Sequence, residues 1–454
     1  MKVIGTSYGR KLGLAGLAVA TVLAVSAPAR AEVSAETAFV FNTFSFLVSG
    51  FLVMWMAAGF AMLESGLVRT KNTATICLKN IALYSVAGIM YYVIGYNLMY
   101  VDVSGFIGSF DLLYNTSDAE KALIGADATP EMIDAVVDNG YSVMSDWFFQ
   151  MVFVATAASI VSGTLAERIK FWPFMIFVVV LTAILYPIQG SWTWGGGWLT
   201  EMGFSDFAGS TIVHSVGGWA ALTGAIILGP RKGKFGADGS VHPMPGANLP
   251  LATLGTFILW LGWFGFNGGS ELALGSAASA SNMAIVYVNT NLAACAGVVS
   301  AIVLTQLIYK KIDLTMALNG AIGGLVAITA GPDLQNHGVT LIIGGIGGAL
   351  VVFAVPLFDK LKIDDVVGAV SAHLVAGIWG TLAVGIFGGG DLVVQIVGIA
   401  AVGAFMIVTS TLVWYALKLT VGLRVDEEAE EMGLDKAELG MEAYPEFGHG
   451  SQSI

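Results

Sequence analysis

Charged residues are scarce in this chain. Only 11% of its 454 residues are Asp, Glu, Lys or Arg, whereas 56% are hydrophobic and the mean hydropathy is +0.78. A soluble domain carries about 25% charged residues, so the composition excludes an ordinary water-soluble fold. A chain this apolar over such a length is typical of a protein that is solvated by lipid.

Cysteine is nearly absent, and so are the motifs of cofactor-dependent and ATP-driven proteins. The two cysteines, Cys77 and Cys295, fall in apolar segments, and we interpret both as small core hydrophobes. A disulfide framework or a metal site needs more than this, so we expect no cofactor. No G-x4-G-K-S/T phosphate loop occurs, which argues against direct drive by ATP. The net charge of −12 gives no reason to expect a nucleic-acid partner.

Glycine is abundant by contrast, with 58 residues. Small residues let membrane helices approach one another closely, and the densest glycine clusters lie at 320–324 and 344–348. This abundance favours a tightly packed helical membrane fold.

The first 31 residues predict a secretory signal peptide that is removed from the mature protein. A basic start precedes an apolar run that is short for a membrane span, and a small-x-small cleavage site follows. These features are Lys2, Arg10 and Lys11, residues 12–25, and Ala29–Ala31. Cleavage places the mature N-terminus outside the membrane, whereas the alternative is a retained first helix.

Apolar segments of membrane-spanning length fill most of the remaining chain. There are eleven, at 40–63, 74–97, 143–165, 171–190, 208–229, 251–268, 281–308, 317–330, 338–357, 367–388 and 393–418. With the N-terminus outside, the inner connections carry Arg69, Lys71, Arg168, Lys170, Arg231, Lys232, Lys234, Lys310, Lys311, Lys360 and Lys362, and the outer loops hold only Lys121. Because cytoplasmic loops are enriched in Lys and Arg, we expect an all-α membrane domain over 32–418 with its C-terminus inside.

One short pattern occurs twice inside these apolar segments. The sequence D-x2-G-x4-H-x3-G is formed by Asp206, Gly209, His214 and Gly218, and again by Asp365, Gly368, His373 and Gly377. Ionisable residues inside a membrane are costly and are therefore functional candidates. A single histidine can also be a satisfied hydrogen-bonding residue between helices, but a matched pair favours a functional site.

The two copies enter the membrane from opposite sides. His214 lies on the fifth predicted helix, which enters from outside, and His373 lies on the tenth, which enters from inside. Two five-helix halves of opposite orientation form an inverted-topology repeat, whose site is expected near the midplane. Each histidine is about 6–7 residues into its helix, or roughly 9–11 Å, and half of the hydrocarbon core is about 15 Å thick. We therefore expect the two imidazole rings to meet near the membrane centre.

Several longer segments resemble the superfamily of ammonium transporters, methylammonium permeases and Rhesus proteins, and in particular its bacterial ammonium transporter branch. They are LAERIKF at 165–171, WGGG at 194–197, DFAGSTIVH at 206–214, WFGFNGGS at 263–270 and GLRVDEEAEEMGLD at 422–435. The resemblance covers essentially the whole mature chain. It implies a multi-pass transporter of the bacterial inner membrane rather than an enzyme, assembled as a homotrimer with one pore in each protomer.

The resemblance also assigns roles to individual residues. The paired pore histidines match His214 and His373, and the outer recruitment site for the cation matches Phe149, Trp194 and Ser270. The pore gate and wall match Phe153, Phe266 and Trp263, an acid of the outer vestibule matches Asp206, and an acid near the inner mouth matches Asp365. Spacing alone would make the phenylalanines ordinary core residues, and each aspartate is equally a helix cap.

Together these residues imply transport of ammonium. Cation–π attraction to Phe149 and Trp194 and a hydrogen bond to Ser270 would hold the ion. A bare cation deeper in the membrane costs from about 3 to more than 10 kcal/mol, whereas neutral ammonia costs far less. We therefore expect deprotonation, passage of ammonia and reprotonation inside, with the proton either relayed by tautomer shifts of the neutral imidazole pair or left behind.

The acidic segment 419–454 is interpreted as a cytoplasmic regulatory tail. Its composition alone indicates a solvated surface. The resemblance implies that it packs under a neighbouring protomer and that a PII-type nitrogen-regulatory protein docks there to close the pore. AELGMEAY at 437–444 departs from the family's usual sequence and weakens the PII inference. Leu374 also departs from the family, which usually has glycine after the second pore histidine.

Three other functions share parts of this pattern. A Rhesus-like neutral gas channel has the same fold but would lack the cation site, whose Trp194 and Ser270 are present here. An ammonium sensor would act through PII capture, although we expect no appended signalling domain. An intramembrane hydrolase would pair serine with histidine, but no G-x-S-x-G motif accompanies either histidine helix.

Overall fold

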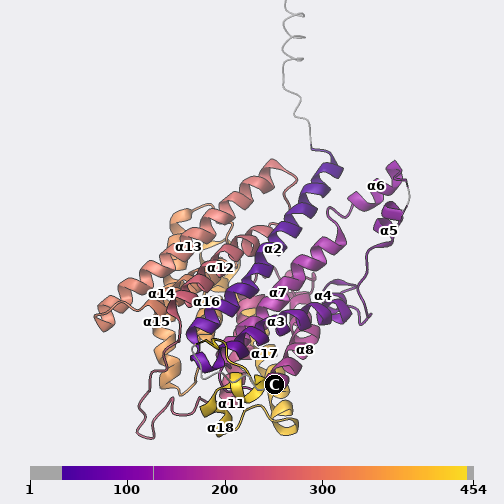
Figure 1. The fold of residues 1–454 in the computed structure, drawn as a ribbon. Coiled ribbons are helices and arrows are strands. Elements are labelled where there is room, and N and C mark those ends of the chain that lie inside the picture. The colour runs from indigo at the N-terminus through magenta and orange to yellow at the C-terminus, as the bar shows by residue number, and fades with distance from the viewer. Residues whose placement is uncertain (1–32, 126, 447–454) are drawn as a thin grey trace, which may run out of the picture.

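The computed structural model describes residues 33–125 and 127–446, and these ranges fold into helices without a β-strand (Figure 1). The predicted signal peptide, residues 1–31, lies outside the described residues, as do residues 447–454 of the predicted tail. The two short helices α5 (Asp118–Gly125) and α6 (Pro130–Val137) mark one end of the molecule. The short helices α18 (Glu427–Met432) and α19 (Leu434–Leu439) mark the other. We refer to these as the loop end and the tail end.

Ten helical segments of the described chain are long and apolar enough to cross a membrane. Single helices make up α2 (Ala35–Leu67), α7 (Val143–Thr164), α12 (Leu249–Gly269), α13 (Ala277–Tyr309), α15 (His337–Lys360) and α17 (Leu392–Thr420). The others contain a π-helical turn: α3–η2–α4 (Thr73–Met90, Tyr91–Gly95, Tyr96–Tyr100), α8–η3–α9 (Phe171–Val180, Leu181–Leu185, Tyr186–Ser191), η4–α11 (Ser210–Ser215, Val216–Leu228) and η5–α16 (Val370–Val375, Ala376–Phe387). The prediction of an all-α, multi-pass membrane fold is confirmed.

Each predicted apolar segment coincides with one of these helices or with α14 (Leu314–Ile328). Because α14 has only 15 residues, a full set of eleven crossings stays a prediction. The largest boundary errors concern α2 and α13, which have 33 residues each. Both helices extend beyond their apolar runs to a capping serine, Ser34 or Ser276, whose hydroxyl accepts a hydrogen bond from a backbone N–H of the first turn.

The glycine clusters lie where α13, α14 and α15 cross. A Cβ atom on Gly297 would approach the Gly320 carbonyl oxygen to 2.2 Å, and one on Gly344 would approach the Ala293 carbonyl oxygen to 2.3 Å. Since no real Cβ fits at such distances, these helices pack backbone against backbone. This is the close packing that small residues permit in membranes.

The two cysteines are not core residues, so the interpretation from the sequence is wrong. Cys77 is exposed on α3, and Cys295 is half-buried on α13. The surface of a membrane helix that faces lipid is as apolar as the surface that faces protein. An apolar neighbourhood in the sequence therefore could not distinguish the two.

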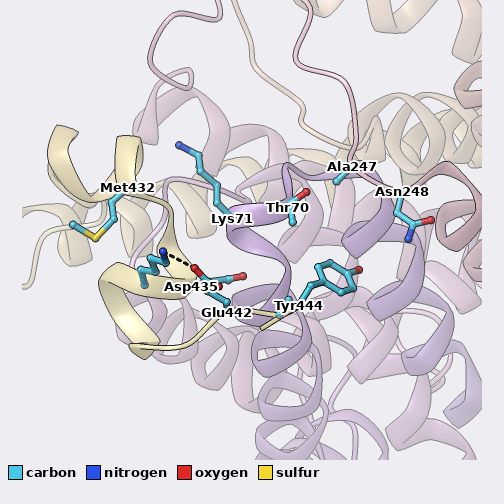
Figure 2. A pocket seen from close by; sticks show the side chains of 10 residues that line it. Thr70, Lys71, Ala247, Asn248, Met432, Asp435, Glu442 and Tyr444 are labelled. Carbon is cyan, nitrogen blue, oxygen red and sulfur yellow. Dashed lines mark ion pairs between the residues drawn. The ribbon is translucent and has the colours of Figure 1, made fainter. Parts of the chain in front are cut away.

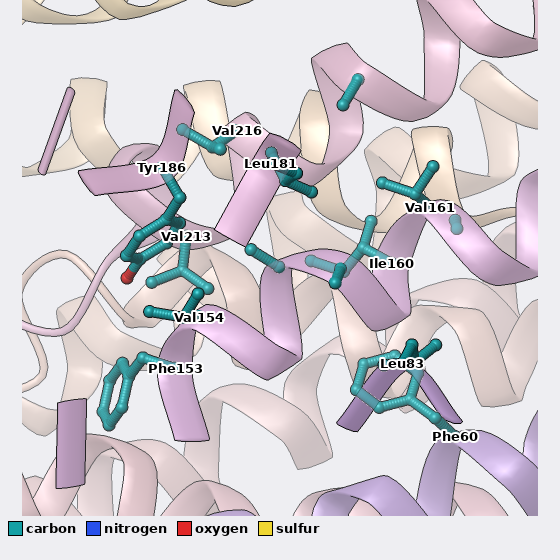
Figure 3. Close-up of a cluster of buried hydrophobic side chains, with 14 of the residues drawn as sticks. Phe60, Leu83, Phe153, Val154, Ile160, Val161, Leu181, Tyr186, Val213 and Val216 are labelled. Atoms are coloured by element: carbon teal, nitrogen blue, oxygen red, sulfur yellow. The ribbon is translucent and has the colours of Figure 1, made fainter. Parts of the chain in front are cut away.

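The core is built around α7, which is buried along most of its length from Ser145 to Thr164. Figure 3 shows Val154 and Ile160 of this helix among buried side chains from neighbouring segments, including Leu181 of η3 and Val213 of η4. Helix α7 thus packs directly against the segment that carries the first histidine.

The tail end is fixed by a buried ionic network that the sequence alone did not indicate. Arg231 binds the Asp364 carboxylate through Nε and Nη2, both at 2.9 Å, and also lies 3.3 Å from Glu167. Arg168 is fully buried and donates to the Asp364 carbonyl oxygen. Burial alone would raise the pKa of the Asp364 carboxyl, but the charges of Arg168 and Arg231 hold it well below its ordinary value. Arg168 and Arg231, which we used to predict the topology, therefore also hold the ends of neighbouring helices together.

The acidic tail packs against the start of α3 of its own chain, and its contact with a neighbouring protomer stays a prediction. The Asp435 carboxylate accepts bonds from the backbone N–H groups of Ala74 and Thr75 at 2.9 and 2.8 Å, so it caps α3. Lys71 donates to the Glu430 carbonyl oxygen at 2.9 Å. Figure 2 shows the hollow of about 510 Å³ between this tail and the start of α3, with Lys71, Asp435 and Tyr444 around it.

Candidate functional site

The aspartate of each repeated motif caps the segment that carries its histidine. Asp206 accepts four backbone N–H groups, from residues 209 to 212, at 2.8–3.0 Å. Asp365 accepts three, from residues 369 to 371, at 2.9–3.4 Å, and also the Thr164 hydroxyl at 2.8 Å. These donors are the ones that the start of a helix leaves without a partner. For Asp206 and Asp365 we considered two roles, an acid that lines the pore mouth and a helix cap. The hydrogen bonds in the structure are those of a helix cap.

The first glycine of each motif occupies a conformation that other residues avoid. Gly209 has φ +108° and Gly368 has φ +80°. Glycine adopts this left-handed region without a steric penalty. The bend lets the aspartate side chain fold back onto the N–H groups that follow it.

The last glycine of each motif lies where the two repeats cross. A Cβ on Gly218 would lie 2.9 Å from the Leu374 backbone nitrogen, and a Cβ on Gly377 would lie 2.5 Å from the Ser210 carbonyl oxygen. The segments run in opposite directions, since Asp206 bonds Trp194 of the loop-end hollow and Asp365 bonds Thr164 at the tail-end terminus of α7. Leu374 is buried against Gly218, so this departure from the family is accommodated by the glycine that faces it.

The crossing brings the two histidines together. Nδ1 of His373 lies 3.3 Å from Nδ1 of His214, and both rings are buried. One nitrogen must therefore donate and the other accept, which leaves the Nε2 atoms pointing away from the shared bond. His214 Nε2 is buried and has no hydrogen-bond partner among the described residues. Each histidine sits within a π-helical turn, a feature that is frequent at functional sites.

Aromatic rings lead from the loop end to this pair. The Phe153 ring stacks on Phe266 at 4.0 Å between centroids, and Phe266 stacks on His214 at 5.2 Å. Trp194 meets Phe153 edge-on at 5.9 Å, and Phe149 contacts Phe153 at 4.8 Å. The side chains assigned to recruitment, gate and pore thus form one continuous column.

Hydrogen bonds hold the polar members of this column in place. Trp263 stacks on His214 at 5.0 Å and donates its indole N–H to the Thr329 hydroxyl at 2.8 Å. Trp194 donates to the Asp206 carbonyl oxygen at 3.0 Å. The Ser270 hydroxyl donates to the Phe266 carbonyl oxygen at 2.8 Å, so its own oxygen is free to accept a bond from a ligand.

A hollow of about 330 Å³ opens above the column at the loop end. Its lining includes Phe149, Phe153, Trp194 and Ser270. It also includes Asp146, Tyr96, Tyr100 and Tyr141, which our sequence analysis did not select. Asp146 could have been found by the criterion that selected the histidines, because it is an ionisable residue within a predicted membrane segment. The tyrosines give no comparable signal, since Tyr96 and Tyr100 lie far from Asp146 in the sequence and Tyr141 falls just outside the predicted membrane segment.

A second hollow, of about 740 Å³, lies at the tail end and includes Asp365, Ser371, Arg231 and Lys234 in its lining. Burial raises the pKa of the Asp365 carboxyl to about 6, although the Thr164 hydroxyl and backbone N–H groups oppose the shift. Burial also raises the pKa of Asp206. Phe60 packs 6.2 Å from the His373 ring, a neighbour that the sequence analysis missed. The histidine pair therefore lies between an aromatic hollow and a charged one.

Comparison with known proteins adds an independent line of evidence. Residues 44–444 match the profile of the Ammonium Transporter Family. The chain is 39% identical to the ammonium transporter Amt2 of Archaeoglobus fulgidus, over 88% of this chain and 87% of that one. It is 40% identical to a putative ammonium transporter of Synechocystis, over 89% of this chain and 90% of that one.

Solved structures give the same picture. A structure titled Sensor Amt Protein superposes with a TM-score of 0.80 at 37% identity, over 88% of this chain and 98% of that one. The crystal structure of Mep2 from Candida albicans superposes with a TM-score of 0.75 at 27% identity, over 87% of this chain and 89% of that one.

Proposed function

This chain belongs to the Ammonium Transporter Family and transports ammonium across a membrane, and we propose that the aromatic column and the paired histidines are its conduction path. The observation that carries the proposal is the contact between His214 and His373 directly below the stacked ring of Phe266. In this proposal the loop end is the outer face, the tail end is cytoplasmic, and the membrane is the bacterial inner membrane.

Ammonium is recruited in the hollow at the loop end. The ring faces of Phe149 and Trp194 attract the cation, and the oxygen of Ser270 accepts one of its hydrogen bonds. These contacts replace part of the hydration shell that the ion loses as it enters.

Ammonium transfers its proton to water at the base of this hollow, and ammonia passes on. Phe153 and Phe266 stack across the way and are both buried, so a cation between them would have no hydrogen-bond acceptors from the rings. Neutral ammonia crosses this layer at far lower cost. Potassium ions have no proton to release, so the same layer discriminates against them.

The histidine pair supplies hydrogen-bonding groups on the far side of the phenylalanines. With one Nδ1 donating to the other across 3.3 Å, one Nε2 is a donor and the other is an acceptor. The pair can guide ammonia and, by exchanging tautomers, relay the proton that ammonium released. Reprotonation follows in the hollow at the tail end.

Further proposals concern the whole assembly. Residues 1–31 are a cleaved signal peptide, residues 32–418 form an eleven-helix transporter domain, and three copies of the chain form a homotrimer. The tail, residues 419–454, is a regulatory segment that a PII-type protein contacts. Support for the tail's role comes from its bonds to Lys71 and to the start of α3, which connect it to the transporter domain. Recovery of a PII protein by the full chain, but not by a chain truncated after residue 424, is the expected result of a pull-down; equal recovery would remove this part.

Solid-supported-membrane electrophysiology on the purified protein in liposomes tests the conduction path. We expect a current on addition of ammonium and none on addition of potassium if the proton is relayed. If the proton stays behind, ammonium should instead alkalinise the lumen of liposomes loaded with a pH-sensitive dye. A potassium current equal to the ammonium current would contradict the selectivity mechanism.

A second candidate function, ammonium sensing, is favoured by one specific observation. The structure that superposes with a TM-score of 0.80 is titled Sensor Amt Protein. Sensing by this chain would require ammonium to change the contacts of the tail. Limited proteolysis of α18 and α19 with and without ammonium separates the two, because a pure transporter should show the same cleavage in both.

A further inference from the structure

We propose that Asp146, with Tyr96, Tyr100 and Tyr141, forms a second cation subsite in the hollow at the loop end. Its ligands would be ammonium and small alkylammonium ions such as methylammonium. The inference rests on the proposed function, since it adds a second binding position to the same entry route.

Asp146 is a buried carboxylate without a cationic partner. Its exposed fraction is 6%, and it lies in the first turn of α7. It accepts hydrogen bonds from the Tyr96 hydroxyl and from the Gln150 amide, the latter at 3.3 Å. No Lys, Arg or His of residues 33–125 or 127–446 forms an ion pair with it.

A buried charge normally has a partner, because its desolvation is costly. A carboxylate can accept about four hydrogen bonds, and only two are made here. Asp146 also lines the hollow rather than facing closed protein. A cation that enters the hollow would therefore complete both the charge balance and the hydrogen bonds of this carboxylate.

The walls around Asp146 are of the kind that binds ammonium groups. Tyr96 packs against Tyr114 at 4.1 Å and against Tyr100 at 5.1 Å between ring centroids. Tyr141 packs against Phe46 on another side of the site. Aromatic rings arranged around a cation are the usual means of recognising alkylated ammonium groups, because the rings attract the charge and also accept the alkyl surface.

Two hydroxyl groups complete the site. The Tyr100 hydroxyl oxygen is buried and has no hydrogen-bond partner in the described part of the chain, so it can accept a bond from an ammonium N–H. Burial and the nearby Asp146 charge raise the pKa of the Tyr141 phenol to about 12, so this hydroxyl stays neutral at ordinary pH. The site thus offers one negative charge and neutral oxygen acceptors.

The site is continuous with the recruitment position. Phe149 follows Asp146 by three residues and Phe153 by seven on α7, and residues at these spacings lie on one face of a helix. All three line the same hollow as Trp194 and Ser270. A cation held at Asp146 is therefore about one helical turn from Phe149 and about two turns from Phe153, which belongs to the stacked pair where we place loss of the proton.

The alternative is a purely structural acid that favours the start of α7 and fixes Tyr96. Such a role predicts loss of folded protein without a selective change in substrate affinity. A binding role predicts a higher half-saturating concentration with the maximal current retained. The two roles can therefore be separated by one titration.

The experiment uses the full chain in liposomes and measures current against the concentration of ammonium and of methylammonium. Asp146→Asn keeps the size and one acceptor oxygen of the side chain but removes its charge. We expect the half-saturating ammonium concentration to rise about tenfold, with the maximal current within about twofold of wild type and an equal or larger shift for methylammonium.

Glu120→Gln is the matched control. Glu120 is also buried near the start of α7, where its carboxylate accepts the Val143 backbone N–H at 3.0 Å, but it does not line the hollow. Its removal should leave the half-saturating concentration unchanged. An equal shift in Glu120→Gln, or no shift in Asp146→Asn, would overturn the proposal.

Tyr100→Phe keeps the proposal testable if Asp146→Asn does not fold. This variant retains the ring and removes only the unpaired hydroxyl, so we expect a smaller rise of about threefold at unchanged maximal current. An unshifted titration would overturn the subsite. Failure of the conduction path itself would look different, because wild-type ammonium currents would then persist after loss of His214 or His373.

Discussion

The two copies of the motif have the same internal structure but opposite surroundings. In each, an aspartate caps the histidine segment, a glycine with positive φ makes the bend, and a second glycine allows the crossing. The copy at the loop end, with His214, opens onto aromatic rings and onto the Asp146 carboxylate, which forms no ion pair within residues 33–125 and 127–446. The copy at the tail end, with His373, opens onto a hollow whose Asp359 is paired with Lys234 at 3.0 Å.

This difference separates what the repeat does from what its surroundings do. The repeat builds a pair of touching rings, for which both copies are needed equally. In our proposal the surroundings set the direction of recruitment, because the loop-end hollow places Asp146, Trp194 and Ser270 next to the ring faces of Phe149 and Phe153. The tail-end hollow instead carries Arg231 and Lys234 beside its aspartates, so it attracts a released cation less strongly.

The largest expected effect comes from breaking the pair itself. His214→Ala and His373→Ala should each lower the ammonium current by about 100-fold or more, since proton transfer by a positioned side chain typically contributes a factor of about 100–10,000. Both variants should lose activity alike if the two copies contribute equally. The measurement is solid-supported-membrane current at saturating ammonium.

His242→Ala provides the control for this prediction. His242 is exposed near the tail end, so removing its ring changes neither the pore nor the core. It should retain wild-type current. Full currents in both pore variants, with liposome incorporation equal to wild type, would contradict the assignment of the pore to this pair.

The caps should differ in the stability that they contribute. Asp206→Ala leaves four backbone N–H groups without an acceptor, and Asp365→Ala leaves three. A buried donor without a partner costs about 1–3 kcal/mol, so both variants should unfold at lower temperature, the outer one by more. Differential scanning fluorimetry in detergent measures this.

Asparagine variants at the same positions keep one acceptor oxygen and should be less destabilised than the alanine variants. If Asn and Ala lowered the unfolding temperature equally, the hydrogen bonds of the caps would not be what stabilises these segments. A reversed order, with Asp365→Ala the less stable, would contradict the comparison of the two copies.

The crossing glycines should show nearly equal effects. Gly218→Ala and Gly377→Ala each place a Cβ within 3.0 Å of the opposite backbone. Overpacking of this kind typically costs about 1–3 kcal/mol, and it also pushes the two histidine segments apart. We therefore expect both a lower unfolding temperature and a reduced ammonium current. Gly105→Ala is the control that separates backbone strain from crowding. A Cβ on Gly105 would meet nothing within 4 Å, but the φ of this residue is +93°. This variant should therefore lose stability and keep its ammonium current.

Much of this architecture could be predicted from the sequence because membranes impose strong constraints. A helix must satisfy its own backbone within lipid, so apolar length located the helices, and the repeated spacing pointed to the histidine pair before its contact was known. The same reasoning treated Asp206 and Asp365 as either caps or ligands, because a carboxylate near a helix start satisfies both descriptions.

The parts that could not be predicted depend on contacts between distant segments. Tyr96 and Tyr100 line the same hollow as Asp146, although they lie more than 40 residues before it and nothing local marks them as its neighbours. The buried Arg231–Asp364 pair joins residues 133 positions apart, while the charge rule for topology treats Arg231 as a solvated cation. The exposure of Cys77 was missed because lipid and protein interior are equally apolar.

The smallest expected effect tests the protonation of the inner cap. Burial raises the pKa of Asp365 to about 6, whereas an unfolded aspartate titrates near about 3.9. Between these values the folded protein binds the proton and the unfolded chain does not, so the stability from this group is complete below about pH 4 and is lost as the pH rises through about 6.

Asp365→Asn is neutral throughout and should lack this loss. The unfolding temperature of wild type minus that of the variant should therefore fall from pH 4 to pH 7, by an amount set by about 1.4 kcal/mol for each unit of pKa shift. A difference that stays flat or rises with pH would show that Asp365 is already ionised in the folded protein at pH 4. Asp365 would then titrate like an exposed carboxylate, and the two caps would differ, because burial raises the pKa of Asp206.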